Sequence, residues 1–579
     1  MDKQISRRAI CDTSTLPEHL HPVLKQIYAS RGISLPSELD QGAASMHKPS
    51  QLMGLDLACE LLFAAIKENK RIIVVGDFDA DGATSTALMM QGLSLLGSTN
   101  HDFIVPNRFE YGYGLTPEIS EIAVAQGVDV IVTVDNGISC IPGVAKAKEL
   151  GAMVIVTDHH LPGSSLPNAD AIVNPNQHGC TFPSKALAGV GVAFYLMAAL
   201  RQTMRSNGWF ASKQIPEPNM AQLLDLVALG TVADVVSLDQ NNRILVAQGL
   251  KRIRAGATRP GIQALIEIAG KNQQKMVASD FGFGLGPRLN AAGRLDDMGL
   301  GIQCLLETDL NKARVMAKDL DDLNKTRREI EQGMQFEAEN VLKKLNFNDS
   351  NLPSALALFQ EDWHQGVIGI VAGRLKEKYH RPTVVFASSN PDDNSDTAEI
   401  KGSARSIPGL HIRDLLEHID SQHPNIILKF GGHAMAAGLS IKLADFDKFQ
   451  TLLNEYAQKW LSAEMLQGKV LSDGELAKDA FNLEFASLLR ESGPWGQNFP
   501  EPVFDNHFKI IQQRIVGEKH LKLMVQIDDL AIDAIAFNVD TSLWPNNQCE
   551  WVHLAYKLDI NEFRGKQTVQ LLVDHIEAA

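Results

Sequence analysis

Three short apolar runs, each followed by acidic residues, recur in the first third of the chain. They are RIIVVGDFDADG at 71–82, DVIVTVDNG at 129–137 and AMVIVTDHH at 152–160, and each precedes a helix-like segment. Continuous apolar runs of this length fit strands that are buried on both faces, as in a parallel sheet. The 23 residues from Asp135 to Asp158 leave room for one helix and a return strand, which predicts a right-handed βαβ unit. Because ligands of an open parallel sheet bind at the carboxyl ends of its strands, we expect one crevice to gather all three acidic clusters.

Longer helical patterns fill the middle of the chain. The segments ALAGVGVAFYLMAAL and NMAQLLDLVALGTVADVV predict helices within 186–253. From about 311 to 345, apolar residues recur at spacings of three, four or seven with charges between them. At about 1.5 Å per residue this pattern predicts one helix about 50 Å long. An ordinary packing helix would show the same pattern, but the change of pattern on either side favours a rigid connector between two domains.

Two further regions follow this helix. Residues 352–465 alternate between strand-like and helix-like segments and predict a second α/β domain, in which NIILKFGGHAMAAGLSI is one strand. In 468–579, WVHLAYKLDI alternates apolar and polar positions and QTVQLLVDHI follows after a turn, which predicts a small β-barrel. The predicted fold is α/β, with an N-terminal segment, a parallel-sheet domain, a connector helix, a smaller α/β domain and a C-terminal barrel at 1–50, 51–305, 306–346, 347–465 and 466–579.

The composition narrows the classes of function. The 579 residues carry 54 Lys and Arg against 69 Asp and Glu, and the formal net charge of −15 by itself argues against a nucleic-acid partner. Six cysteines lie far apart without a CxxC pair, so neither a disulfide framework nor a zinc ribbon is indicated. The longest apolar run, at about 188–200, is shorter than the roughly 20 residues of a membrane span. We therefore expect a cytoplasmic protein with reduced thiols and no membrane contact.

Asp77, Asp79 and Asp81 are three carboxylates within five residues. Carboxylates this close repel one another unless cations neutralise them, and oxygen-rich clusters suit Mg²⁺ or Mn²⁺. A solvated loop with Gly82 as a turn residue would fit the same pattern. A calcium EF-hand is excluded, because position 88 is Leu where that loop needs Glu.

The other two strand ends strengthen the metal hypothesis. Asp135 alone is ambiguous, because Asp-Asn-Gly is a common turn sequence. Asp158, His159 and His160 are more specific, since two imidazoles beside a carboxylate offer ligands for Mn²⁺ or a comparable ion. The three ends together predict a site for two Mg²⁺ or Mn²⁺ ions, which fits two-metal hydrolysis of a phosphoester. No GxSxG or GxxxxGK[ST] motif competes, and we expect FGFGLG at 281–286 to be a loop.

Several polar side chains stand among small residues, where a sugar–phosphate backbone has room to approach. The candidates are Arg108 in PNRFEYGYGL, Arg288 and Arg294 in GPRLNAAGRLDD, Ser403 and Arg405 in KGSARS, and Gly431, Gly432 and His433 in FGGHAMAAG. We expect GPRLNAAGR to form a Gly-rich loop. An ordinary turn with a solvated arginine would explain each motif taken singly.

GDFDADG, VDNG, TDHH and GTVAD together resemble the four motifs of the DHH phosphoesterase superfamily, and RSI followed by GGHAMAAG resembles its associated second domain, DHHA1. The motif order, the long helix, LNAAGR, WHQGVIGI and PWGQNFPEPVF resemble the bacterial branch of exonucleases specific for single-stranded DNA. The resemblance implies 5′→3′ release of mononucleotides in DNA repair and recombination. It also implies single-stranded DNA as substrate, with single-stranded-DNA-binding protein and repair or recombination helicases as partners; we expect a monomer.

The resemblance also implies roles for individual residues. The expected metal ligands are Asp79, Asp81, Asp135 as a bridge, His159 and Asp234 in GTVAD, with Asp225 as a less favoured substitute for Asp234. The smaller members of the superfamily carry a histidine where this chain has Val75, so either the first metal site is less occupied here or Asp77 helps to form it. His160 would contact the scissile phosphate or leaving group, and Asp158 is the second expected catalytic residue. Ser85 matches the serine that follows the ligands and is expected to contact the substrate.

Contacts to the strand are implied in the same way. Arg108 and an arginine of GPRLNAAGR would hold the 5′ phosphate, while Ser403, Arg405 and His433 would grip the strand from the second domain. Ala404 stands where the family has glycine, which weakens the case for close backbone approach there. The barrel resembles an OB-fold, which holds single strands by aromatic stacking and basic residues. Its candidate contacts are Arg514, Lys519, Lys522, Arg564 and Lys566.

Two other functions stay open at this point. Small-phosphoester hydrolases, such as pyrophosphatases and cyclic-dinucleotide phosphodiesterases, share the four motifs, but they leave the β domain unexplained. A non-catalytic DNA-binding scaffold would fit degenerate relatives, although every metal-ligand motif here is intact. The net charge decides nothing, because five of the acidic residues belong to the predicted site and two divalent ions would return about +4 there.

Overall fold

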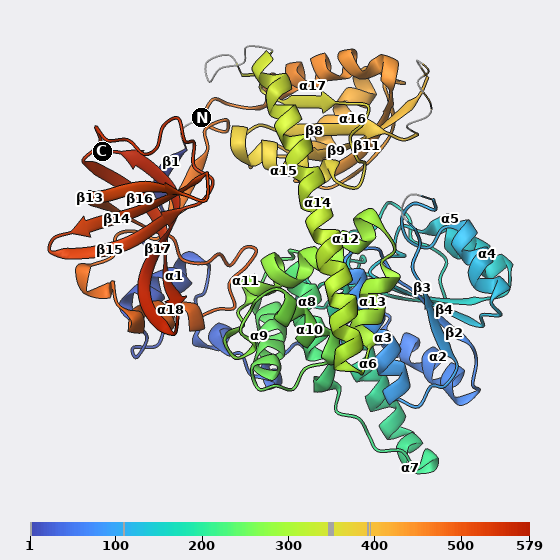
Figure 1. Ribbon diagram of the computed structural model, residues 1–579. Coiled ribbons are helices and arrows are strands. Elements are labelled where there is room, and N and C mark those ends of the chain that lie inside the picture. The colour runs from blue at the N-terminus through green and yellow to red at the C-terminus, as the bar shows by residue number, and fades with distance from the viewer. Residues whose placement is uncertain (1–2, 108–109, 345–351, 391–392, 394, 396) are drawn as a thin grey trace.

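The computed structural model describes residues 3–107, 110–344, 352–390, 393, 395 and 397–579. Figure 1 shows two α/β units joined by one long helix, α14 (Leu310–Lys344), with a β-barrel on the other side of that helix from the first sheet. The predicted α/β class, the connector helix and the C-terminal barrel are confirmed. The five domain limits stay predictions.

The first sheet has five strands, all parallel, and its three central strands are the predicted apolar runs. Its order is β3 (His101–Ile104), β2 (Ile72–Val75), β4 (Val130–Val134), β5 (Met153–Thr157) and β6 (Ala171–Val173). Alternate residues of β2 and β4 pack against helices on opposite faces of the sheet. One face packs on α2 (Leu55–Lys67), α3 (Ala80–Leu95) and α6 (Gly189–Ser206), and the other on α4 (Pro117–Ala125) and α5 (Ile141–Glu149). This two-sided cover explains why the central strands read as uninterrupted apolar runs.

A helical layer connects this sheet to α14. It contains α7 (Trp209–Lys213), α8 (Leu224–Ala233), α9 (Gln240–Arg254), α10 (Pro260–Ile268), α11 (Ala278–Asp280), α12 (Gly286–Leu295) and α13 (Gly299–Leu306). The expectation of loops at FGFGLG and GPRLNAAGR is wrong. Phe281–Leu285 forms a π-helix (η6) that runs directly into α12, because the small residues of both segments allow close helix packing rather than a turn.

The second sheet is mixed and has the order β10–β11–β9–β8–β7, in which only β7 and β8 are parallel. The strands are β7 (Leu356–Phe359), β8 (Thr383–Ser388), β9 (Glu399–Arg405), β10 (Ile427–Gly432) and β11 (Ala436–Lys442), with helices α15 (Ile368–Tyr379), α16 (Ile412–Gln422) and α17 (Phe446–Trp460). The prediction of one strand across NIILKFGGHAMAAGLSI is wrong. The segment is a hairpin, because Gly432 has φ +142° and the chain reverses there.

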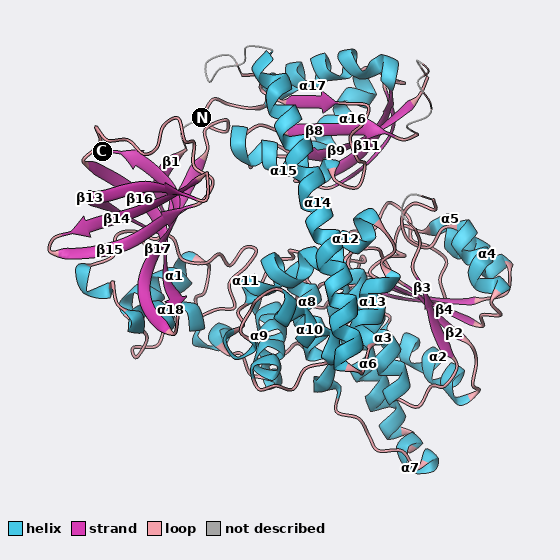
Figure 2. Cartoon of the chain, in the orientation of Figure 1, coloured by secondary structure: helices cyan, strands magenta, loops and turns pink. Residues whose placement is uncertain are grey.

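The C-terminal barrel is closed, in the order β13–β14–β15–β17–β16, and carries α18 (Leu483–Glu491) beside it. Its strands are Phe504–Val516, His520–Ile527, Leu530–Ala536, Trp551–Phe563 and Lys566–Ala578 in chain order (Figure 2). The N-terminal segment does not stand apart. Its strand β1 (Gln4–Arg7) pairs in parallel with β12 (Lys469–Ser472), and Arg31, directly after α1 (Pro22–Ser30), forms an ion pair with Asp473.

The 3₁₀ helices are short. They lie at Pro36–Leu39, Ala43–Ser45, Pro49–Gln51, Met220–Leu223, Gln273–Lys275, Leu443–Asp445 and Lys478–Ala480. Within the described ranges no single helix has both the length and the apolar composition to cross a membrane. One pair of helical segments that bends by 85°, Ala43–Gln51 with Leu55–Lys67, passes by length and composition together.

Candidate metal centre

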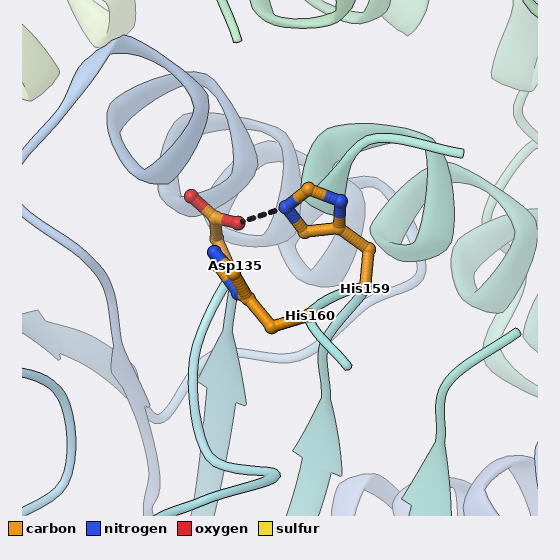
Figure 3. A group of neighbouring side chains, drawn as sticks. All are labelled: Asp135, His159 and His160. Atoms are coloured by element: carbon orange, nitrogen blue, oxygen red, sulfur yellow. Dashed lines mark ion pairs between the residues drawn. The ribbon is translucent and has the colours of Figure 1, made fainter. Parts of the chain in front are cut away.

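The three predicted strand ends meet at one edge of the first sheet. Asp135 follows β4 and His159 follows the neighbouring strand β5, and Figure 3 shows the two side chains pointing toward each other. The His159 Nε2 atom lies 3.1 Å from Asp135 Oδ1 and 3.5 Å from Asp234 Oδ2. Asp81, from the first turn of α3, has a carboxylate oxygen 4.0 Å from the same nitrogen. Four residues from four separate segments therefore converge on one point.

The converging side chains form overlapping ligand groups whose donor atoms lie within 4.8 Å of one another. The groups are Asp81 with His159 and Asp234, Asp77 with Asp79 and Asp135, and Asp135 with His159 and His160. Asp135 and His159 each belong to two of these groups, so the three groups form one continuous cluster of possible donor atoms.

The donor atoms of these side chains are better arranged to bind a cation than to hydrogen-bond to one another. Asp135 Oδ1, His159 Nε2 and Asp234 Oδ2 are buried and have no hydrogen-bond partner. Burial and the charges of neighbouring carboxylates raise the pKa of Asp81 to about 7 and hold the pKa values of Asp135 and Asp234 well above their usual range. Burial lowers the pKa of His159 to about 4, so its imidazole is neutral at pH 7. Unpaired carboxylates beside a neutral imidazole are costly unless cations neutralise them, so this donor set suits divalent metal ions.

The N-terminus of α6 holds Asp81 in place. The backbone amides of Gly189 and Val190 donate to its two carboxylate oxygens at 2.7 and 2.9 Å. A Cβ atom on Gly189 would lie 2.6 Å from Asp135 Oδ1, so only glycine lets the helix approach both carboxylates. Sequence reasoning missed this contact, although the small residues of ALAGVGV were a signal for it. Ser85 is fully buried behind Asp81, 3.5 Å from Oδ1, which corrects its expected contact with substrate.

Asp158 orients His160 and belongs to none of the ligand groups among the described residues. Its Oδ1 atom lies 2.8 Å from His160 Nδ1, and Oδ2 accepts from the amide of Ile138. Burial alone would lower the pKa of His160, but the hydrogen bond to Asp158 and the surrounding carboxylates raise it to about 9. The Tyr113 hydroxyl lies 3.3 Å from the same Nδ1 atom and donates to the Asp135 carbonyl. The Nδ1 side of the ring is thus occupied, which leaves Nε2 for a ligand.

The structure separates Asp234 from Asp225. Asp234 ends α8 and joins the ligand group, whereas Asp225 lies in the first turn of the same helix and is buried in an ion pair with Arg259. The Arg259 guanidinium donates to both oxygens of Asp225, at 2.6 and 3.0 Å. Asp225 therefore has a structural partner, and the expected preference for Asp234 agrees with this placement.

Family models match most of the chain. They are the DHH family N-terminal domain at 71–231, the DHHA1 domain at 352–459 and the RecJ OB domain at 472–575. Among curated relatives, the single-stranded-DNA-specific exonuclease RecJ of Escherichia coli (strain K12) is 56% identical over 99% of both chains. The chain belongs to the RecJ family.

RecJ proteins at lower sequence identity also match nearly all of this chain. RecJ of Bacillus subtilis (strain 168) is 32% identical over 96% of this chain and 68% of its own. The crystal structure of RecJ in complex with Mn²⁺ from Thermus thermophilus matches with a TM-score of 0.77 at 29% identity, and the match covers 97% of this chain and 76% of that one. The metal-centre geometry described above therefore lies within a RecJ fold.

The LNAAGR motif of this RecJ family member supports the metal-binding turn. Asn290 Oδ1 accepts from the Ala80 amide at 2.8 Å, and a Cβ atom on Gly293 would lie 1.7 Å from the Phe78 carbonyl oxygen. Arg288 is buried, donates to Gly284 and forms an ion pair with Asp321 of α14, which corrects its expected contact with phosphate. The motif packs against the turn because its small residues leave no side chain between α12 and the Asp77–Asp81 segment.

One contact links the second unit to the helical layer of the first. Burial, and then the charges of His160, Arg413 and His411, lower the pKa of His433 in the FGGHAMAAG turn. The Arg294 guanidinium donates to the Gly366 carbonyl at 3.0 Å and so links α12 to the segment before α15. Gly431 has open space where a Cβ atom would stand, whereas one on Gly432 would meet Ala436 at 2.5 Å.

Arg405 lies beside the start of α15. Its guanidinium donates to Ser403 Oγ and to the Ala404 carbonyl, and no carboxylate of the described residues pairs with it. A Cβ atom on Gly369 would lie 2.9 Å from both Arg405 Nη2 and Ser403 Oγ. Gly369 in WHQGVIGI is thus a second residue that the motif search did not single out. Arg108 lies outside the described residues.

Proposed function

We propose that this chain is a single-stranded-DNA-specific exonuclease that hydrolyses phosphodiester bonds in the 5′→3′ direction and releases mononucleotides. The observation that carries the proposal is the set of overlapping Asp and His ligand groups at the carboxyl edge of the first sheet. The family places it among metal-dependent nucleases. A small-phosphoester hydrolase is not favoured, because the family match includes the C-terminal OB domain.

We assign the metal ligands to Asp77, Asp79, Asp81, Asp135, His159 and Asp234, which suit two Mg²⁺ or Mn²⁺ ions. Bound divalent ions of this kind lower the pKa of a water and neutralise charge on the attacked phosphate. Asp81 is held by backbone amides of α6, so its carboxylate keeps its position without reorganisation. Solved RecJ structures with Mn²⁺ and with Mg²⁺ from Thermus thermophilus support this choice of ions.

His160 is the proposed contact to the scissile phosphate or leaving oxygen. Asp158 and Tyr113 surround its Nδ1 atom, so the Nε2–H group points away from them and is available to donate. The hydrogen bond to Asp158 and the charge of that carboxylate favour the protonated imidazole, which suits a hydrogen bond to an anionic oxygen. Asp158 is then a positioning residue for His160.

We propose Arg405 as the contact to a phosphate of the substrate strand in the second unit. Its guanidinium lies beside Gly369 at the start of α15 and pairs with no carboxylate of the described residues, which favours a phosphate. Ser403, His433 and the open face of Gly431 would hold the adjacent sugar–phosphate, while Arg108 and Arg294 stay proposed contacts to the 5′ phosphate.

End-labelled single strands test this proposal directly. In the presence of Mn²⁺, label at the 5′ end should be released first as a mononucleotide, and blunt duplex should be degraded far more slowly. Release of 3′ label first, or equal rates on both substrates, would refute it. Asp81→Ala and His159→Ala should abolish hydrolysis while strand binding persists. As a matched control, Asp322→Ala removes a carboxylate exposed on α14 and should leave hydrolysis intact.

The partners, the location and the oligomeric state of this chain are also proposals. We propose single-stranded-DNA-binding protein and repair or recombination helicases as partners, a cytoplasmic location and a monomeric chain. The RecJ OB domain supports contact with single-stranded DNA through a surface that includes Arg514, Lys519, Lys522, Arg564 and Lys566. Lys522 already pairs with Asp533 at 3.3 Å, so we expect its contribution to strand binding to be small.

A further inference from the structure

Val235 has an unusual backbone for its residue type. It directly follows the proposed ligand Asp234, has φ +63° and exposes 62% of its surface. The left-handed region is unfavourable for a β-branched residue, and glycine would adopt it without strain. A strained conformation that also exposes an apolar side chain has no benefit for folding. Such strain is typical of functional sites.

Phe283 is a second exposed apolar side chain, and it lines the same groove as Val235. It is the central residue of the π-helix and exposes 82% of its surface. The π-helix packs against the last turn of α8, because a Cβ atom on Gly282 would lie 3.6 Å from Val232 and one on Gly286 would lie 3.1 Å from Ala233. Arg288 fixes this π-helix through the Gly284 carbonyl at 2.6 Å. π-Helical turns occur frequently at functional sites.

Val235 and Phe283 line one groove between the catalytic unit and the barrel. The groove has a volume of about 1220 Å³, and Trp495 and residues of β16 and β17 also line it. Some of its charged groups pair with one another: Lys271 with Asp280 at 2.8 Å, Lys557 with Glu501 at 3.1 Å, and Arg490 with Asp559 at 3.7 Å. Lys251 and Arg254 also line the groove, and no carboxylate of the described residues forms an ion pair with either, so the groove offers cations for a phosphate backbone beside an exposed aromatic face.

We infer that Phe283 stacks on a nucleobase of the substrate strand and that Val235 forms the apolar floor beside it. The inference rests on the proposed function, because its ligand is the same strand. The occupant follows from position and charge, since Val235 follows the proposed ligand Asp234 in the chain and the cations Lys251 and Arg254 line the same groove. An aromatic ring accepts every base by its π face, so this contact is independent of sequence. It would hold the strand between the metal centre and the barrel.

The test compares variants of the full chain on strands of increasing length. Phe283→Ala should weaken binding of a 2-aminopurine-labelled strand, measured with chelator present, by about 5- to 150-fold, the range for one lost base stack. In the presence of Mn²⁺ the loss should lie in KM rather than kcat and should grow with strand length. Phe283→Trp should retain most of the affinity. Phe336→Ala removes another aromatic ring, 67% exposed on α14 and outside the groove, and is the matched control.

Val235→Gly distinguishes the backbone strain at this position from the contact of its side chain with the strand. Because glycine tolerates φ +63°, this variant should melt at or above the wild-type temperature and still bind the strand less tightly. Unchanged strand affinity and KM for Phe283→Ala at every strand length would overturn the inference, as would an equal loss of strand affinity for Phe336→Ala. If the groove binds a protein segment instead of the strand, Phe283→Ala should leave strand affinity and KM unchanged. Failure of the wild-type chain to cleave any strand would refute the proposed function instead.

Discussion

Asn290→Ala tests whether α12 positions the metal-binding turn. Asn290 Oδ1 accepts a 2.8 Å hydrogen bond from the amide of Ala80, the residue between the proposed ligands Asp79 and Asp81. Ala80 is 1% exposed, so water does not readily replace the lost acceptor. The variant leaves this amide without its partner and loosens the turn on which two ligands stand.

The magnitude follows from the cost of a buried unsatisfied amide. Such a group costs about 1–3 kcal/mol. Since each 1.4 kcal/mol is a factor of ten, full transfer of this cost to the metal site would weaken binding by about 5- to 150-fold. Loss of an outer partner of a metal site commonly costs about 10- to 100-fold in affinity. We therefore expect the dissociation constant for Mn²⁺ to rise by about 10- to 100-fold.

Calorimetric titration with Mn²⁺ measures this change without any substrate. Asn482→Ala is the matched control, because Asn482 Oδ1 also accepts a 2.8 Å hydrogen bond from a backbone amide, that of Phe485 at the start of α18. The control should lose some thermal stability and keep its Mn²⁺ affinity. Wild-type Mn²⁺ affinity in a folded Asn290→Ala protein would refute the positioning role.

Three further outcomes are expected. Asp225→Asn should destabilise the chain by about 3–5 kcal/mol in urea unfolding, because it leaves Arg259 buried without its partner, yet the folded protein should keep its Mn²⁺ affinity. Gly369→Ala should raise KM for single strands about tenfold or more with kcat nearly unchanged, since its Cβ displaces the Arg405 guanidinium and about 1.5–3 kcal/mol of charge-assisted hydrogen bonding. Burial alone would raise the pKa of Asp505, but hydrogen bonds led by that from Arg7 lower it to about 2 from 3.8. This lowered pKa contributes roughly 2 kcal/mol to the free energy of unfolding, which is present above about pH 4 and lost as pH falls toward 2.

Each of these outcomes has a result that contradicts it. Loss of Mn²⁺ binding in folded Asp225→Asn would restore that residue as a ligand. An unchanged KM for Gly369→Ala would remove the phosphate site at α15. For Asp505, the difference in unfolding free energy between wild type and Asp505→Asn should shrink as pH falls from 5 to 3; a constant difference would show that the Arg7 contact does not depend on ionisation.

The sequence by itself determined the elements and the chemistry of the centre. Uninterrupted apolar runs predicted the buried strands β2, β4 and β5, because a strand that is buried on both faces carries apolar residues at consecutive positions. The carboxylates and histidines follow those runs directly, so the parallel topology was enough to bring Asp135 and His159 to one edge. The α14 helix could also be predicted from the sequence, because its apolar residues recur at helical spacing over one long continuous segment.

Only the tertiary structure decided which partner each side chain has. Arg288 carries the same motif context as a phosphate contact, but it bonds to Asp321, 33 residues later in the chain. Asp225 and Asp234 lie on one helix, and the position of Arg259 separates their roles. Gly189 and Phe283 stand in Gly-rich segments that the sequence shows, but their roles come from the segments that approach them in the fold. Periodicity reports burial along one segment, whereas hydrogen bonds, ion pairs and exposed stacking faces depend on segments far apart in the sequence.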